Sequence, residues 1–187
     1  MDTPAAEAFR AASLFFTDAV VAVPRERYDE RWSDEWRVLD LIGHGNRANA
    51  LTVEYYERPA AIAGPEYLLP EHIAERARQA TREMGDDPVS AVRAASARVL
   101  ALVASAPVDA MVGTPFGERL FDVYLRSRTA ELVVHGLDLG TDVEPPSVAL
   151  EDCAAFLAST AVRHGHGVAV VRGLSGRGGL PPGFSVY

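Results

Sequence analysis

The sequence predicts an all-α protein, a four-helix bundle with one or two extra peripheral helices. Three observations support this fold class. Long segments repeat apolar residues every three or four positions, proline and glycine mark the ends of these segments, and no convincing strand-turn-strand pattern occurs. The chain has 187 residues, close to the size of one domain, so we expect a single domain over 1–187.

The first predicted helix covers residues 4–23, and a polar connection follows it. The second covers residues 38–57 and ends before Pro59. Helical spacing in the first helix marks four candidate core positions: Phe9, Phe16, Val20 and Val23.

A third predicted helix, residues 70–85, begins with Pro70 and Glu71 and stops at Gly85. It is polar on most sides, so we expect it outside the bundle as a peripheral helix.

Two further helices and a tail complete the expected order. A helix over 87–106 is followed by a loop at 107–118, which leads to the helix that carries "TAELVVHGLDLG" (129–140). The last predicted helix covers 146–165. The glycine- and proline-rich segment from about 173 is expected to be an extended tail.

Composition and charge restrict the class of partner. The formal net charge is −8, which argues against nucleic acid or an anionic membrane. No apolar run approaches the ~20 residues that span a bilayer, and the N-terminus lacks the basic start of a signal peptide. With a single cysteine, these features predict a cytoplasmic protein. All 18 basic residues are arginine, which indicates a GC-rich genome such as an actinobacterial one.

A polar row runs along the helix that carries residues 129–140. Glu131 and His135 are four residues apart and share a face with Tyr124, Arg128 and Asp138. Buried ionisable groups need partners. The flanking residues on both sides of the row are apolar: Phe121, Val123, Leu125, Leu132 and Val134.

A divalent metal ion is one such partner, because zinc accepts histidine nitrogen and carboxylate oxygen and often has three protein ligands at catalytic sites. The third ligand should come from a facing helix, and His44 in the second helix is the best candidate. The alternatives are an ordinary surface pair for Glu131 and His135, and a core histidine bonded to a carbonyl for His44.

Two motifs, "WRVLDLIGHGNRAN" and "RSRTAELVVHGLDL", resemble the mycothiol-dependent maleylpyruvate isomerase family of the DinB-like superfamily of metal-binding four-helix bundles. The tail "LSGRGGLPPGFSVY" is also similar to the family's usual ending. The matching positions are Trp36, Asp40, Leu41, His44, Arg128, Glu131, His135, Gly136, Asp138 and Leu139.

The resemblance implies a DinB-like bundle with a divalent metal, usually zinc, held by His44, Glu131 and His135. It also implies a cytosolic actinobacterial setting in which mycothiol is the main small thiol. The expected partners are then a small-molecule substrate and a thiol. Whether the protein is a monomer or a homodimer stays open.

Three departures from the family pattern stand out. Arg37 replaces a helix-capping Ser or Thr, although Asp40 can still reach back to the helix start. Gly45 replaces a bulky aliphatic residue, which is expected to open space beside the metal. The maleylpyruvate isomerases proper carry an extra C-terminal domain that this chain is expected to lack, so maleylpyruvate isomerisation itself is disfavoured.

The favoured function is metal activation of mycothiol for transfer to, or isomerisation of, a small electrophile. Asp138 is expected to orient His135. Arg128 pairs with Glu131 or binds a substrate carboxylate, and Tyr124 fills the core or donates a proton. No other catalytic residue is assigned. The alternatives are a metal-dependent hydrolase and a non-catalytic metal- or ligand-binding bundle.

Overall fold

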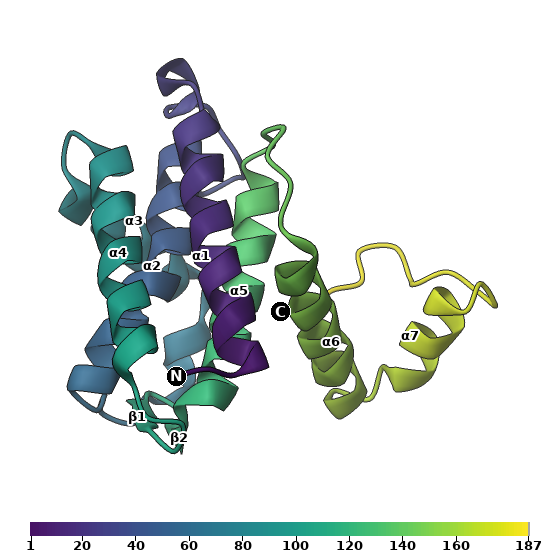
Figure 1. Cartoon of the computed structure of the whole chain (residues 1–187). Coiled ribbons are helices and arrows are strands. Elements are labelled where there is room, and N and C mark those ends of the chain that lie inside the picture. The colour runs from purple at the N-terminus through teal and green to yellow at the C-terminus, as the bar shows by residue number, and fades with distance from the viewer. Residues whose placement is uncertain (187) are drawn as a thin grey trace.

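The computed structural model describes residues 1–186 and confirms the all-α class (Figure 1). Seven α-helices and one two-stranded hairpin make up the regular structure of these residues, with short 3-10 turns at Arg25–Arg27 and Pro65–Leu68. The helices are α1 (Pro4–Ala22), α2 (Val38–Glu57), α3 (Pro70–Met84), α4 (Pro88–Ser105), α5 (Phe121–Asp138), α6 (Ser147–Arg163) and α7 (Gly167–Leu174).

Four of these helices form the bundle. Helix α1 packs against α4 and α5, and α2 packs against the same two helices from the other side. Helix α3 lies outside the bundle, mainly against α2, as its polar sequence predicts. Helix α6 covers α1 and α5, and α7 packs on α6 as a helical arm at the side of the bundle (Figure 1).

The sequence did not predict helix α7. The bundle therefore has three additional helices in the described residues, α3, α6 and α7, where one or two were expected. The segment is only eight residues long and has a glycine at its start, which leaves too short a periodic pattern to identify. The expected tail begins after it: residues 175–186 form no helix or strand.

The first helix packs as its spacing predicts. Phe9, Phe16 and Val20 are fully buried, and Val23 is 4% exposed. The helix begins where Thr3 accepts a hydrogen bond from the amide of Ala6 at 3.1 Å, which satisfies one of the free amides of the first turn.

The segment expected as a plain loop contains a hairpin, so the prediction of no strands is wrong here. Strands β1 (Met111–Thr114) and β2 (Gly117–Leu120) pair antiparallel. Gly117 adopts φ +99°, and the chain after α2 adds a hydrogen bond from the amide of Ala60 to the carbonyl of Gly113 (2.9 Å). Each strand has only four residues, too few to show a clear alternating pattern.

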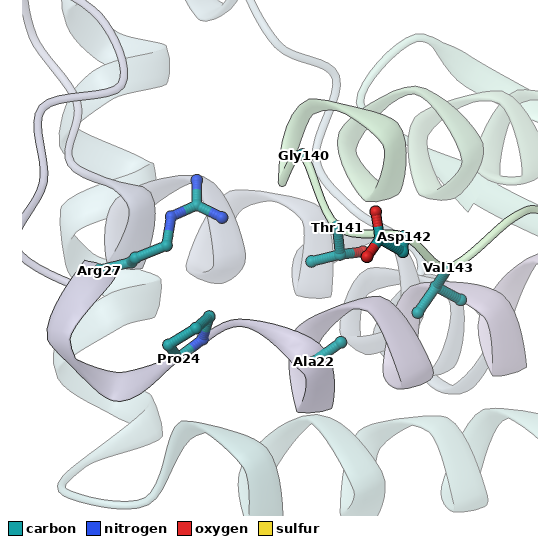
Figure 2. A pocket seen from close by; sticks show the side chains of 7 residues that line it. All are labelled: Ala22, Pro24, Arg27, Gly140, Thr141, Asp142 and Val143. Carbon is teal, nitrogen blue, oxygen red and sulfur yellow. The ribbon is translucent and has the colours of Figure 1, made fainter.

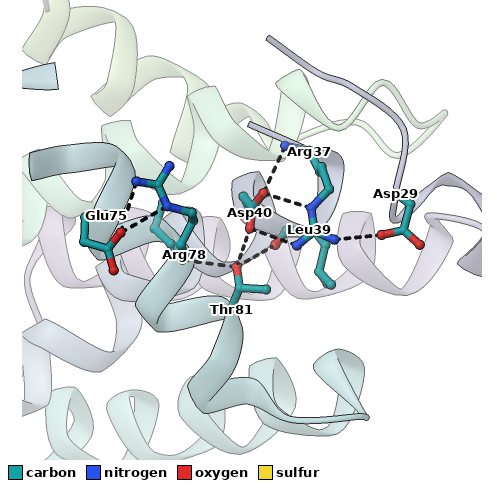
Figure 3. Close-up of polar contacts among 8 residues, drawn as sticks. Asp29, Arg37, Leu39, Asp40, Glu75, Arg78 and Thr81 are labelled. Atoms are coloured by element: carbon teal, nitrogen blue, oxygen red, sulfur yellow. Dashed lines mark hydrogen bonds and ion pairs between the residues drawn. The ribbon is translucent and has the colours of Figure 1, made fainter. Parts of the chain in front are cut away.

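Helix α2 begins with a cap that one of its own first-turn residues supplies (Figure 3). Asp40 Oδ2 accepts the amide of Arg37 at 3.1 Å, as predicted, and Asp40 Oδ1 accepts the hydroxyl of Thr81 from α3 at 3.2 Å. The Arg37 guanidinium bridges Asp40 and Asp29. Burial acts to raise the pKa of Asp40, but these hydrogen bonds outweigh it and hold that pKa below its ordinary value of 3.8.

Glycines allow α1 to pack closely against α2 and α5. A Cβ atom at Gly45 would lie 2.5 Å from Phe16, and one at Gly136 would overlap the ring of Phe15. The expectation that Gly45 leaves open space beside the metal is therefore wrong, because the buried ring of Phe16 occupies that space.

Helix α4 has 18 residues and a mean hydropathy of 1.2, so by length and composition it is the one described helix able to cross a membrane. Its buried residues recur every three or four positions, and its other face exposes Arg93 and Arg98. This amphipathic pattern is that of a bundle helix.

We expect Gly45→Ala and Gly136→Ala to lower the free energy of unfolding by about 1–3 kcal/mol each. The added methyl group meets a buried phenylalanine ring, and this overpacking outweighs the gain in helix propensity. Chemical denaturation measures the effect. Gly179→Ala is the matched control, because a Cβ there meets nothing within 4 Å; equal stability of all three variants would refute the packing argument.

We expect Asp40→Asn to lower the free energy of unfolding by about 1–3 kcal/mol at pH 7. Because the folded pKa of Asp40 is depressed, its contribution is present above pH 3.8 and disappears as the pH falls through the folded pKa. The difference in free energy of unfolding between Asp40→Asn and the wild type should therefore become smaller as the pH falls below 3.8. Asp34→Asn, at a side chain 96% exposed, should change little at either pH.

Candidate metal centre

Helices α2 and α5 bring the three predicted ligands together. One ligand atom from each of His44, Glu131 and His135 lies within 4.8 Å of the other two. Glu131 Oε2 is 3.2 Å from His135 Nε2 and 3.9 Å from His44 Nε2. Within the described residues, this is the one such group of three or more His, Cys, Asp or Glu side chains.

The three side chains are only partly buried, with exposed fractions of 19% for His44, 22% for Glu131 and 16% for His135. The candidate centre is therefore not completely enclosed. The apolar residues expected to flank the polar row on both sides are not all buried. Val123 is 53% exposed, whereas Phe121 and Leu132 are fully buried.

His44 and Glu131 are in the protonation states that a metal ion requires. Burial and the neighbouring charge of His135 lower the pKa of His44 to about 3, so its ring is neutral at neutral pH. Burial acts to raise the pKa of Glu131, but the hydrogen bond with His135 and the charge of Arg128 lower it to about 2. A neutral imidazole and a carboxylate are the forms that bind metals.

His135 is held between two carboxylates. Its Nδ1 lies 3.2 Å from Asp138 Oδ2, which leaves Nε2 directed at Glu131. Burial lowers the pKa of His135, but the two carboxylates raise it to about 9. At neutral pH, the imidazole therefore carries a proton at the position where a cation would bind.

Arg128 and Tyr124 continue the same face of α5. The Arg128 guanidinium lies 3.8 Å from Glu131 Oε1 and 5.2 Å from the centre of the Tyr124 ring. The pairing with Glu131 that the sequence offered as one role of Arg128 is therefore present. Tyr124 is 5% exposed, and burial raises the pKa of its hydroxyl, which matches its interpretation as a core residue.

Sequence reasoning named Trp36 as a motif position but not its contact with His44, and it gave no role to Tyr67, Arg47 or Arg76. Trp36 packs on His44. Tyr55 and Tyr67 share a hydrogen bond of 3.2 Å between their hydroxyls, and Arg76 lies over the Tyr67 ring at 4.1 Å. Arg47 follows His44 by three residues and lowers its pKa. That i,i+3 spacing was the available sequence signal for Arg47.

Arg47 and Arg76 have no carboxylate partner among the residues that the structure describes. Arg47 and Arg128 place positive charge beside His44, and Arg76 lies close enough to Arg47 for their charges to interact. This positive charge favours a ligand that carries negative charge.

A separate depression of about 390 Å³ lies between the end of α1 and the loop after α5 (Figure 2). It contains none of the three predicted metal ligands, and Arg27 and Asp142 are its only charged residues. The lining residues are Ala22, Pro24, Arg27, Gly140, Thr141, Asp142 and Val143. The depression is therefore separate from the candidate metal centre.

Fold and site together define a helical bundle with a candidate metal centre shared by two of its helices. The family model described as "Mycothiol maleylpyruvate isomerase N-terminal domain" matches residues 9–140. The chain belongs to this family. The match includes both α2 and α5, and thus all three predicted ligands.

Two solved structures are similar to this chain. One is the crystal structure of the mycothiol-dependent maleylpyruvate isomerase, with a TM-score of 0.63 and 16% identity, covering 96% of this chain and 93% of that chain. The other is a histidine-to-alanine mutant of that isomerase, with a TM-score of 0.61, 17% identity and the same coverage. No curated protein matches the sequence.

The structural similarity extends beyond the family region. It covers 96% of this chain, so it includes part of the segment after residue 140, where α6 and α7 lie. The expectation that this chain lacks a C-terminal part of the isomerase needs correction, because the match covers 93% of that isomerase chain.

Proposed function

We propose that this protein is a cytoplasmic metalloenzyme that activates a small thiol, mycothiol, for reaction with a small electrophile. The observation that carries the proposal is the convergence of His44, Glu131 and His135 from two helices inside the family-matched region. Nitrogen and carboxylate donors of this kind suit zinc, and three protein ligands leave a position open for a substrate.

The residues present fit such a metal. His44 supplies an unprotonated nitrogen, Glu131 a carboxylate, and His135 a second nitrogen once its proton is released. A bound divalent metal would lower the pKa of a coordinated thiol and so supply a thiolate nucleophile.

The other residues prepare the site for that chemistry. Asp138 fixes the orientation of the His135 ring, and Arg128 holds the Glu131 carboxylate. Arg47 and Arg76 bind a negatively charged part of the substrate or of the thiol. The product is either a thioether or, if the thiol leaves again, an isomer of the substrate.

We expect the protein, prepared without a histidine tag, to hold about one equivalent of zinc or another divalent metal. His135→Ala should lose the metal because one of three ligands is removed, whereas His164→Ala, at an exposed residue after α6, should retain it. Elemental mass spectrometry measures the content. A wild type without metal, unaffected in folding by His135→Ala, would rule out the site.

The same preparations test the chemistry. Thiol consumption is followed with mycothiol and a panel of activated alkenes, epoxides and alkyl halides. We expect turnover by the wild type and His164→Ala proteins and none by His135→Ala. Metal-loaded protein that leaves every electrophile unreacted would oppose the proposed thiol transfer while leaving the metal site intact.

We expect Asp138→Asn to weaken metal affinity by about 10–100-fold, the usual effect of removing the hydrogen-bond partner of a ligating histidine. Competition with a chromophoric chelator measures the affinity. Asp142→Asn, at an aspartate in the next loop, should bind metal as the wild type does. Equal affinities for both variants would show that Asp138 does not support His135.

A further inference from the structure

The two histidines of the candidate metal centre are held in different ways. His135 has a carboxylate partner on Nδ1, in Asp138. The Nδ1 atom of His44 is buried, and no described residue forms a hydrogen bond with it. Ligating histidines almost always use the second ring nitrogen for such a bond, which fixes the orientation of the ring. The His44 ring therefore needs another support.

The side chains of α2 that share a face with His44 lie three and four residues away, at Asp40, Leu41, Arg47 and Ala48. None of them forms a hydrogen bond with Nδ1 of His44. The ring contacts that the structure shows come instead from Trp36, before the helix, and from His135 of α5.

Trp36 makes the closest aromatic contact with His44. The two ring centres are 4.6 Å apart and the planes are inclined by 54°. The His135 ring meets His44 edge-on, with centres 4.8 Å apart. His44 thus lies in contact with two aromatic rings, and such contacts restrict ring orientation as well as contributing packing energy.

Trp36 is itself fixed by the turn before α2. Its carbonyl accepts the amides of Trp32 (2.9 Å) and Ser33 (3.1 Å), and Arg31 and Arg37 form a β-bridge around the turn. The Trp32 ring centre lies 5.8 Å from that of Trp36, and Trp32 is 41% exposed, whereas Trp36 is partly buried against the core. The Trp36 indole, which contacts His44, is therefore held in place by the turn, and the more exposed Trp32 ring packs beside it.

We propose that Trp36 is a positioning residue that orients His44 for metal binding, in the place that a hydrogen bond to Nδ1 would otherwise take. The proposal rests on the proposed function, because it requires a metal at His44, Glu131 and His135. It also follows that the fluorescence of Trp36 responds to metal binding, since its ring contacts a ligand ring.

The test measures zinc affinity, by competition with a chromophoric chelator, for the wild type and four variants: Trp36→Phe, Trp36→Leu, Trp32→Phe and Trp32→Leu. Trp36→Leu should weaken affinity by about tenfold or more, as loss of a ligand's support does. Trp36→Phe keeps an aromatic ring and should stay within about threefold of the wild type. Both Trp32 variants should bind zinc as the wild type does.

Fluorescence gives a second readout that does not depend on whether Trp36→Leu folds. The chain has two tryptophans, so each Phe variant leaves one emitting residue. Zinc should change the emission of Trp32→Phe, which retains Trp36, by more than that of Trp36→Phe. Circular dichroism and thermal unfolding of the two Leu variants separate a loss of affinity from a loss of fold.

Three results would overturn the proposal: wild-type affinity in a folded Trp36→Leu, an equal loss in Trp36→Phe and Trp36→Leu, or no emission change in Trp32→Phe on saturation with zinc. A wild type that binds no zinc refutes the proposed function, and the role of Trp36 with it. A wild type that binds zinc alongside an unaffected Trp36→Leu refutes the role of Trp36 alone.

Discussion

The arrangement of the candidate metal centre depends on two phenylalanine side chains of α1 that pack against glycines of α2 and α5. Phe16 occupies the space that a side chain at residue 45 would need, and Phe15 does the same at Gly136. Each of these glycines directly follows a candidate ligand in the sequence, His44 or His135. Because well-packed interiors resist small displacements, the two phenylalanines hold α2 and α5 at the separation at which their side chains meet.

That packing also determines which charged groups lie beside each histidine. Two carboxylates, Glu131 and Asp138, lie on either side of His135, while His44 stays neutral because it is buried beside positive charge. Arg47 of α2 and Arg128 of α5 place positive charge beside this candidate centre, and Arg76 of α3 lies near Arg47. In the proposed function, Glu131 would bind the metal and the neighbouring arginines would attract an anionic molecule. Both properties suit a metalloenzyme that acts on a charged small molecule.

The helical arm and the candidate centre belong to different parts of the structure. Helices α6 and α7 follow α5 and lie on the side of the bundle, where α7 packs on α6 (Figure 1). The family model ends at residue 140, before both helices, yet the similarity to the solved isomerase structures continues past that point at 16–17% identity. The bundle therefore carries the features that define the family, and the arm is a structural continuation of the same fold.

Helical periodicity and its stop signals were enough to predict the class, six of the seven described helices and the peripheral place of α3. Fixed helical spacing likewise placed Glu131, His135 and Asp138 on one face. Tertiary structure decided the features that depend on contacts distant in sequence: the hairpin at β1 and β2, the filled space at Gly45 and the packing of Trp36 on His44. A sequence pattern indicates which face of a helix is apolar, but not which side chain of another helix occupies the space beside it. For that physical reason, the candidate ligands could be proposed from the sequence, whereas the contacts around them could only be seen in the fold.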